Sequence, residues 1–86
     1  MTGQKKELKR IDWDIVKRIL RLLYDEGKTK KTHIATKCNL NYDQTILYLE
    51  WMAMVNFIKK INYNSFEVIS LSDGGMTLYM QKMKAV

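Results

Sequence analysis

Lysines gather in the middle of the chain at a spacing suited to binding a polyanion. The stretch from Lys28 to Lys37 holds four lysines and no acidic residue, and two more lysines follow at Lys59 and Lys60. Ammonium groups bind phosphate oxygens as point charges, and hydroxyl or imidazole groups at a helix N-terminus can add contacts. The residues expected to contact a nucleic-acid backbone are Lys28, Lys30, Lys31, Thr32, His33, Lys37, Lys59 and Lys60. For His33, a plain surface position in the first turn of a helix is an equally good interpretation.

Composition is consistent with that chemistry and limits the class of protein. The chain has 86 residues, 47% of them hydrophobic, which is enough for one domain with one packed core. Fifteen Lys and Arg against nine Asp and Glu give a formal charge of +6. Such a balance favours a polyanionic partner, most often nucleic acid, although a merely basic solvated surface is the alternative. The single cysteine, the lack of a signal-peptide pattern and the lack of an apolar run of roughly 18 residues predict a soluble cytoplasmic protein with no membrane partner.

The first long helix is predicted from the spacing of apolar residues and from its end signals. Asp12 is a suitable N-cap, and Gly27 is a suitable residue to end a helix after Glu26. The apolar surface between them is broad, which predicts packing on two sides, against the core and against a second subunit. We expect residues 1–11 to form a basic N-terminal arm and residues 12–86 to form the domain.

The middle of the chain predicts two further helices joined by a short turn. Thr32 is expected to cap a short helix over residues 33–37, and Asn41 is expected to cap the next, over residues 42–55. Asn56 is a suitable residue for the left-handed conformation that ends a helix.

A β-hairpin and a last helix complete the predicted order. Residues 57–61 and 66–70 are rich in β-branched and aromatic residues and are expected to form two strands, with a turn over residues 62–65. Ser72 is expected to cap a last helix over residues 73–84. The predicted fold is α+β but mostly α: three helices, a β-hairpin wing and a C-terminal helix, which is the order of a winged helix-turn-helix domain.

Two segments resemble a known family. The run KKTHIATKCNLNYDQTILYLEWMAMVNFIKK is similar to the winged-helix domains of small archaeal transcription regulators, which are related to the ten-kilodalton DNA-binding chromatin proteins of crenarchaea. The segment SLSDGGMTLYM is similar to the one that often opens their last helix. The resemblance covers about residues 12–83 and implies a homodimer that binds double-stranded DNA, with the second motif helix in the major groove and the hairpin as wing. It also implies a gene of an archaeon or an archaeal virus.

The helix that this resemblance places in the major groove carries no positive charge. Residues 41–58 contain no Lys or Arg, and Asp43 stands where family members often have a basic residue. The candidate base contacts are Asn41, Asp43, Gln44 and Leu47, with Tyr48 at the margin. Amides pair with adenine, a carboxylate accepts from cytosine and an apolar group meets a thymine methyl. We therefore expect the lysines to supply affinity and this helix to supply sequence preference.

Leu47, Trp51 and Met54 form an apolar stripe on the side of the same helix that is expected to be exposed. Trp51 is expected either to pack under the wing or against the N-terminal arm, or to join an interface with a second subunit or a partner protein. The main functional hypothesis is a DNA-binding transcription regulator. The alternatives are a protein-interaction module that uses this stripe and a sequence-nonspecific chromatin protein.

Two further groups of residues are assigned to contacts. At the wing tip, Asn62, Tyr63 and Asn64 are expected either to reach DNA or to be turn residues without a function. The predicted dimer interface is formed by Ile15, Ile19, Leu22, Tyr79, Met80 and Met83. No motif of an enzyme is found, His33 is the only histidine, and Cys38 is expected to be a buried turn residue. We therefore expect a protein that is not an enzyme and that uses no metal and no cofactor.

Overall fold

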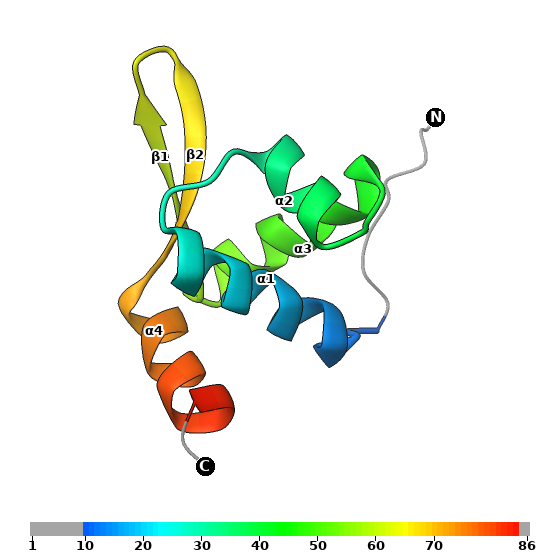
Figure 1. Ribbon diagram of the computed structural model, residues 1–86, viewed down its shortest axis with the longest axis vertical. Helices are drawn as coiled ribbons and strands as arrows, with labels where there is room; N and C mark the ends of the chain where they lie inside the picture. Colours follow the sequence, from blue (N-terminus) through cyan, green and yellow to red (C-terminus); the bar gives the residue numbers. More distant parts are fainter. Residues whose placement is uncertain (1–9, 85–86) are drawn as a thin grey trace.

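The computed structural model, which describes residues 10–84, has the predicted order of elements (Figure 1). The helices and strands are α1 (Trp13–Glu26), α2 (Lys31–Lys37), α3 (Tyr42–Met54), β1 (Ile58–Tyr63), β2 (Phe66–Leu71) and α4 (Asp73–Tyr79), followed by a π-helical segment over Met80–Lys84. The fold is a mostly helical winged helix, as the sequence predicts. Of the predicted basic arm, only Arg10 and Ile11 belong to the described residues, and Arg10 is exposed.

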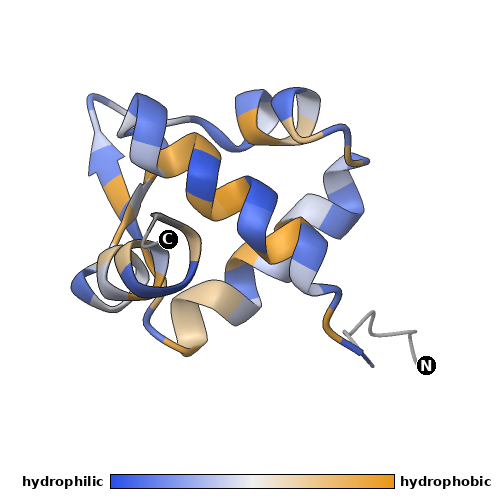
Figure 2. Ribbon diagram, turned by 60° about the horizontal axis from the view of Figure 1, so that its bottom comes forward, coloured by the Kyte–Doolittle hydropathy of each residue, from blue (hydrophilic) through white to orange (hydrophobic). Residues whose placement is uncertain are grey.

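The ends of α1 are those that the sequence predicts. The Asp12 side chain accepts a hydrogen bond from the backbone N–H of Asp14 at 3.0 Å, and Gly27 has a φ of 78° and donates its N–H to the carbonyl of Leu23. A left-handed residue at this place suits glycine because glycine has no Cβ. Figure 2 shows hydrophobic and hydrophilic positions alternating along α1, the pattern of a helix that lies on a core.

The start of α2 differs from the prediction. The helix begins at Lys31, its N-cap is Lys30 and no side chain caps it, so the expected capping role of Thr32 is wrong. The reason is a pairing distant in the sequence. Thr29 exchanges two backbone hydrogen bonds with Ile69 of β2, at 2.9 and 2.8 Å. These bonds hold the chain extended up to Lys30, and Thr32 therefore falls within the first turn of the helix.

The caps around α3 are as predicted. The Asn41 side chain accepts a hydrogen bond from the N–H of Gln44 at 2.7 Å, and Asn56 follows the helix in the left-handed conformation with a φ of 66°. Four residues on one side of α3 are buried, and a fifth is half-buried. These are Thr45, Tyr48, Leu49 and Met52, with Ala53 half-buried.

The β-hairpin has longer strands and a shorter turn than predicted. Only Asn64 and Ser65 form the turn, and both have a positive φ, of 45° and 73°. Two such residues make the turn whose twist matches that of paired strands, so Asn62 and Tyr63 belong to β1. The pairing runs from Ile58 with Leu71 to Tyr63 with Phe66.

The strand register divides the hairpin into two faces, because side chains alternate along a strand. The inner face turns toward the core and carries Ile58, Lys60, Asn62, Glu67, Ile69 and Leu71. The outer face carries Lys59, Ile61, Tyr63, Phe66, Val68 and Ser70. Lys59 and Lys60 thus lie on opposite faces.

Close backbone contact fixes α4 at the root of the wing. Ser72 caps the helix as predicted: its hydroxyl accepts from the N–H of Gly75 at 3.3 Å and donates to the carbonyl of Asn56. A Cβ on Gly75 would lie 1.9 Å from the carbonyl oxygen of Phe57. Glycine is therefore required here to let the first turn of α4 approach the connection between α3 and β1. The chain stays helical to Lys84, but its last turn is π-helical.

One core joins the helices to the hairpin. Its fully buried residues come from α1, α2, α3 and β2, and include Val16, Ile19, Leu20, Ile34, Leu49, Met52 and Ile69. Because β2 and both motif helices contribute to the same core, the wing and the helix-turn-helix are fixed relative to each other.

Candidate nucleic-acid interface

The lysine-rich loop is attached to the wing as a third extended segment. Thr29 pairs with Ile69 and is buried, so its side chain points to the inner side. By alternation its two neighbours point to the outer face of the hairpin. The ammonium of Lys30 lies 4.3 Å from the ring centroid of Phe66, and that of Lys28 lies 5.7 Å from the ring centroid of Tyr63. Both lysines are exposed, and their positions are set by this attachment.

Lys31, the next cation, connects the start of α2 to the wing. Its ammonium lies 2.6 Å from a carboxylate oxygen of Glu67 on the inner face of the hairpin. The hydrogen bond to Glu67 raises the pKa of Lys31, and the same bond lowers the pKa of the Glu67 carboxyl. The sequence did not indicate this pair, because it depends on the pairing of Thr29 with Ile69 of β2. Lys31 is therefore held by an acid rather than free for phosphate.

The remaining polar groups of α2 differ in their contacts. Thr32 and Lys37 are exposed, at the beginning and at the end of the helix. His33 is exposed too, but its Nε2 lies 2.9 Å from a carboxylate oxygen of Glu26 at the end of α1. His33 thus connects α1 to α2 and would have to leave Glu26 to contact a phosphate.

The beginning of α3 presents polar groups to solvent. Asn41 and Asp43 are exposed, while Gln44 and Leu47 are half-buried. The cap bond uses only the amide oxygen of Asn41, so its amide nitrogen is not part of the cap. All four residues that the sequence places in the first turn and a half therefore reach the surface at least in part.

Tyr48 was wrongly assigned to base contacts. Its side chain is 3% exposed, and its hydroxyl accepts a hydrogen bond from the backbone N–H of Asp12 at 2.9 Å. That bond satisfies the polar end of a buried ring and connects α3 to the start of α1. Tyr48 is a structural residue.

The apolar stripe of α3 is not a continuous free surface. Trp51 packs edge-to-face against Trp13 of α1, with ring centroids 5.9 Å apart, and against Phe57, at 5.8 Å. Of the stripe's three residues, only Met54 is exposed, at 75%, while Leu47 and Trp51 are half-buried. Trp51 thus packs within the chain, as one of the two expectations had it, although its partners are the first residue of α1 and the residue before β1.

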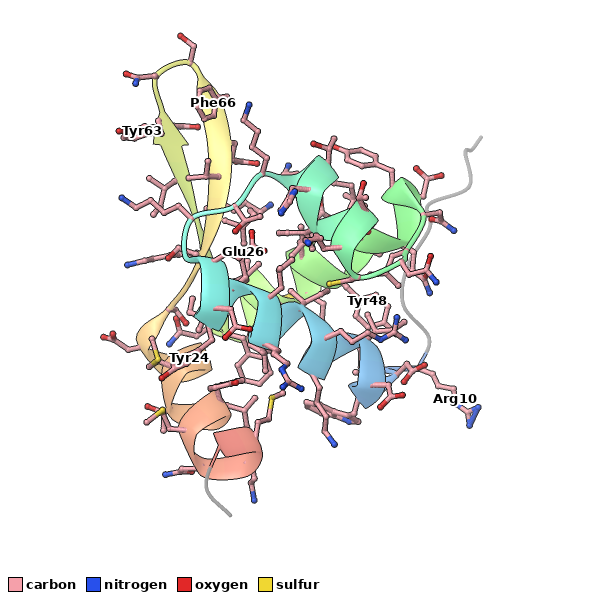
Figure 3. All side chains as sticks on the ribbon, viewed as in Figure 1. Arg10, Tyr24, Glu26, Tyr48, Tyr63 and Phe66 are labelled. Atoms are coloured by element: carbon pink, nitrogen blue, oxygen red, sulfur yellow. The ribbon has the colours of Figure 1, made fainter. Side chains whose placement is uncertain are left out.

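On the wing, the expected contact residues are all exposed. Lys59, Lys60 and the three residues expected at the wing tip are accessible to solvent. Figure 3 shows Tyr63 and Phe66 near the end of the hairpin, at a distance from the helices. Phe66 was not among the predicted site residues, because its place opposite Tyr63 depends on a shorter turn than the sequence predicts.

The predicted dimer interface is only partly available. Ile15, Ile19 and Tyr79 are buried within the chain itself, so their assignment to a contact between subunits is wrong. Both sides of the broad apolar surface of α1 are covered by the chain's own elements, and Tyr79 stacks on Tyr24 of α1 with centroids 4.3 Å apart. Leu22 and Met83 are half-buried, and Met80 is exposed.

Near Met83 an apolar groove of about 420 Å³ lies between α1 and the end of the chain's last helix. It is lined by Trp13, Val16, Lys17, Leu20, Leu78, Lys82 and Met83.

Within residues 10–84, no group of three or more His, Cys, Asp or Glu side chains could hold a metal ion. No helix in the same range is long and apolar enough to cross a membrane.

Comparison with known proteins identifies the family. A family model described as winged helix-turn-helix matches residues 9–84. The chain belongs to the winged helix-turn-helix family. No curated protein matches the sequence.

Two solved structures share the winged-helix fold. The protein RV1404 from Mycobacterium tuberculosis superposes with a TM-score of 0.75 at 16% identity, over 78% of this chain and 48% of that one. A MarR family protein from Bacillus stearothermophilus superposes with a TM-score of 0.78 at 16% identity, over 86% of this chain and 52% of that one. The chain spans about half the length of these two proteins, and the likeness concerns the fold.

Proposed function

We propose that this winged-helix protein binds double-stranded DNA as a dimer and regulates transcription by occupying its site. The observation that carries the proposal is the set of exposed cations around a motif helix that has no positive charge of its own. Lys28, Lys30, Lys37, Lys59 and Lys60 are exposed on the loop, α2 and the wing. In Figure 1 the hairpin and α2 lie toward one end of the molecule, and α4 lies at the other.

Affinity and sequence preference come from different residues in this proposal. The lysines and Thr32 contact phosphates, which fixes the position of the protein without regard to sequence. Asn41, Asp43, Gln44 and Leu47 face the base edges, where amide, carboxylate and apolar groups discriminate between base pairs. The wing places Asn62, Tyr63 and Asn64 beside the same duplex.

The dimer of this proposal uses the surface of α4 and the adjoining part of α1. Met76 and Met80 expose more than two fifths of their surface on the last helical segments, and half-buried Met83 lies beside the groove that borders α1. A two-fold dimer contacts half-sites about one helical turn, ~34 Å, apart. Light scattering at micromolar concentration should give twice the monomer mass, and a monomer mass would count against this part of the proposal.

The phosphate contacts are tested with a triple variant and a control of equal charge. Lys28→Ala, Lys30→Ala and Lys37→Ala in one protein should abolish binding to a random-sequence duplex. The control, Lys17→Ala, Arg21→Ala and Lys82→Ala, removes the same charge from exposed positions around α1 and the end of the last helix. It should keep most of the affinity. Equal losses in the two variants would mean that net charge, and not the lysine-rich loop, carries the binding.

The alternative functions make different predictions. A protein-interaction module would bind its partner through Leu47, Trp51 and Met54, but Trp51 is engaged within the chain. A sequence-nonspecific chromatin role, of the kind known in archaea, would use the same lysines and would not depend on Gln44. A selection from random duplexes that enriches no sequence would favour the chromatin role over the regulator.

A further inference from the structure

Two aromatic rings lie exposed side by side on the outer face of the hairpin. Tyr63 and Phe66 are 52% and 41% exposed, their ring centroids are 6.1 Å apart, and the ring planes make an angle of 70°. A cross-strand aromatic pair stabilises a hairpin, which explains the contact between the rings. It does not explain why two large rings at the end of the wing are left open to solvent.

Cations surround these rings on the same face. Lys30 and Lys28 lie over the rings of Phe66 and Tyr63 as described above, and the register adds Lys59. Among the described residues of β1 and β2, no acidic side chain belongs to the outer face, since Glu67 is on the inner one. Flat aromatic surfaces next to positive charge are the arrangement with which proteins bind single-stranded nucleic acid.

We infer that the outer face of the hairpin binds single-stranded DNA, with unpaired bases stacked on Tyr63 and Phe66 and neighbouring phosphates bound by Lys28, Lys30 and Lys59. The angle between the rings decides against a duplex as ligand. Two planes inclined by 70° cannot both lie parallel to the bases of one continuous stack. Bases that stack on both rings are therefore splayed apart, as they are in single strands.

The lysines that now lie over the rings do not prevent stacking. A cation over an exposed ring contributes about two- to fivefold to an equilibrium, whereas a base stacked on an aromatic ring contributes roughly five- to 150-fold. The base therefore displaces the ammonium group from the ring. The displaced ammonium remains next to the bound nucleotide, where a phosphate replaces the ring as its partner. An acidic peptide would satisfy the lysines but offers no flat surface for the rings.

This activity goes beyond duplex binding, and the two are measured separately. The probe is a fluorescein-labelled 12-nucleotide oligothymidylate, and the variants are Tyr63→Leu and Phe66→Leu, which keep an apolar side chain and remove the ring. Each should weaken binding of the oligonucleotide by roughly tenfold. Tyr63→Trp and Phe66→Trp should keep or raise the affinity. Duplex affinity should change by less than about threefold in Phe66→Leu, because Phe66 is not among the residues proposed to contact the duplex.

A matched control and a spectroscopic measurement exclude indirect effects. Tyr42→Leu removes a ring of similar exposure from the start of α3 and should leave oligothymidylate binding unchanged. An oligonucleotide with a central 2-aminopurine should lose fluorescence on binding, through stacking, and the leucine variants should lose this quenching. Thermal melts followed by circular dichroism show whether every variant is folded.

Three results would overturn the inference. The first is oligothymidylate binding that does not depend on the two rings. The second is a loss of oligothymidylate affinity in Tyr42→Leu as large as in the two leucine variants of the rings. The third is tighter binding of the matching oligouridylate, which would assign the face to RNA. Ring-dependent binding of the single strand without duplex binding would support this inference while contradicting the proposed function.

Discussion

Replacing Glu67 by glutamine should make the protein bind DNA more tightly and at the same time make it less stable. Glu67 holds the ammonium of Lys31 at 2.6 Å, at the start of α2. In Glu67→Gln the partner is neutral, so Lys31 is released and can bind a phosphate. The same substitution removes an acidic group from the surface proposed to face DNA.

The expected size of the gain follows from counterion release. One additional phosphate contact makes the slope of log affinity against log salt steeper by about 0.9. Between 50 and 200 mM salt, this corresponds to roughly 3.5-fold more loss of affinity than in the wild type. The cost in stability is small, because the two side chains are 26% and 34% exposed and solvent screens the pair. It should amount to about 1 kcal/mol or less.

The pH dependence of that cost identifies its origin. The contact with Lys31 lowers the pKa of Glu67, so its stabilisation is present at neutral pH and is lost as pH falls through the lowered pKa. The raised pKa of Lys31 means that the stabilisation persists until pH rises through that value. The difference in unfolding free energy between wild type and Glu67→Gln should therefore vanish near about pH 2.

Fluorescence anisotropy on a random-sequence duplex, titrated at several salt concentrations, measures the slope. Asp14→Asn is the control, because it makes the same change in charge in the first turn of α1, in a different part of the molecule from the wing. Identical slopes in Glu67→Gln and Asp14→Asn would show that Lys31 gains no phosphate contact, and would refute the reasoning.

Three further predictions follow from single residues. Gly75→Ala should lower the unfolding free energy by about 1–3 kcal/mol, because the new Cβ would meet the backbone carbonyl of Phe57, whereas exposed Thr77→Ala in the same helix should change it little in thermal melts. Gln44→Ala should alter the sequences enriched from random duplexes and leave the salt slope unchanged; an unaltered selection would mean that Gln44 contacts no base. Cys38 is buried and burial raises its pKa, so iodoacetamide should react at least about tenfold faster with the chain in urea than with the folded protein, and equal rates would show that the thiol is accessible.

The sequence predicted those features of the fold that depend on near neighbours. The caps at Asp12, Asn41 and Ser72 form bonds within three residues, and so their residue types reveal them. The false cap at Thr32 arose from a pairing between Thr29 and Ile69, forty positions apart, which no local pattern encodes. The order of helices and strands was also predictable, because periodicity and end signals are patterns among residues close together in the sequence.

The candidate site was less predictable because its details depend on tertiary contacts. Tyr48 was assigned to the margin of the base contacts, but it is buried and its hydroxyl accepts a hydrogen bond from the N–H of Asp12. The pairing of Lys31 with Glu67 and the contact of Lys30 with Phe66 depend on the pairing of Thr29 with Ile69, which aligns the lysine-rich loop with β2. Helical periodicity shows that a residue lies on the apolar side of its helix. It does not show whether another part of the same chain or a second subunit covers that side. For that reason Ile15 and Ile19 were assigned to a subunit contact.

The central claim is that exposed lysines bind the phosphates of duplex DNA around a helix without positive charge. The most direct test is the affinity of the wild-type protein for a random-sequence duplex, measured by anisotropy between about 50 and 200 mM salt. With six to eight phosphate contacts per subunit, the affinity should fall by roughly a thousandfold or more over that range. Binding that is absent at low salt, or that does not weaken as salt rises, would contradict the account.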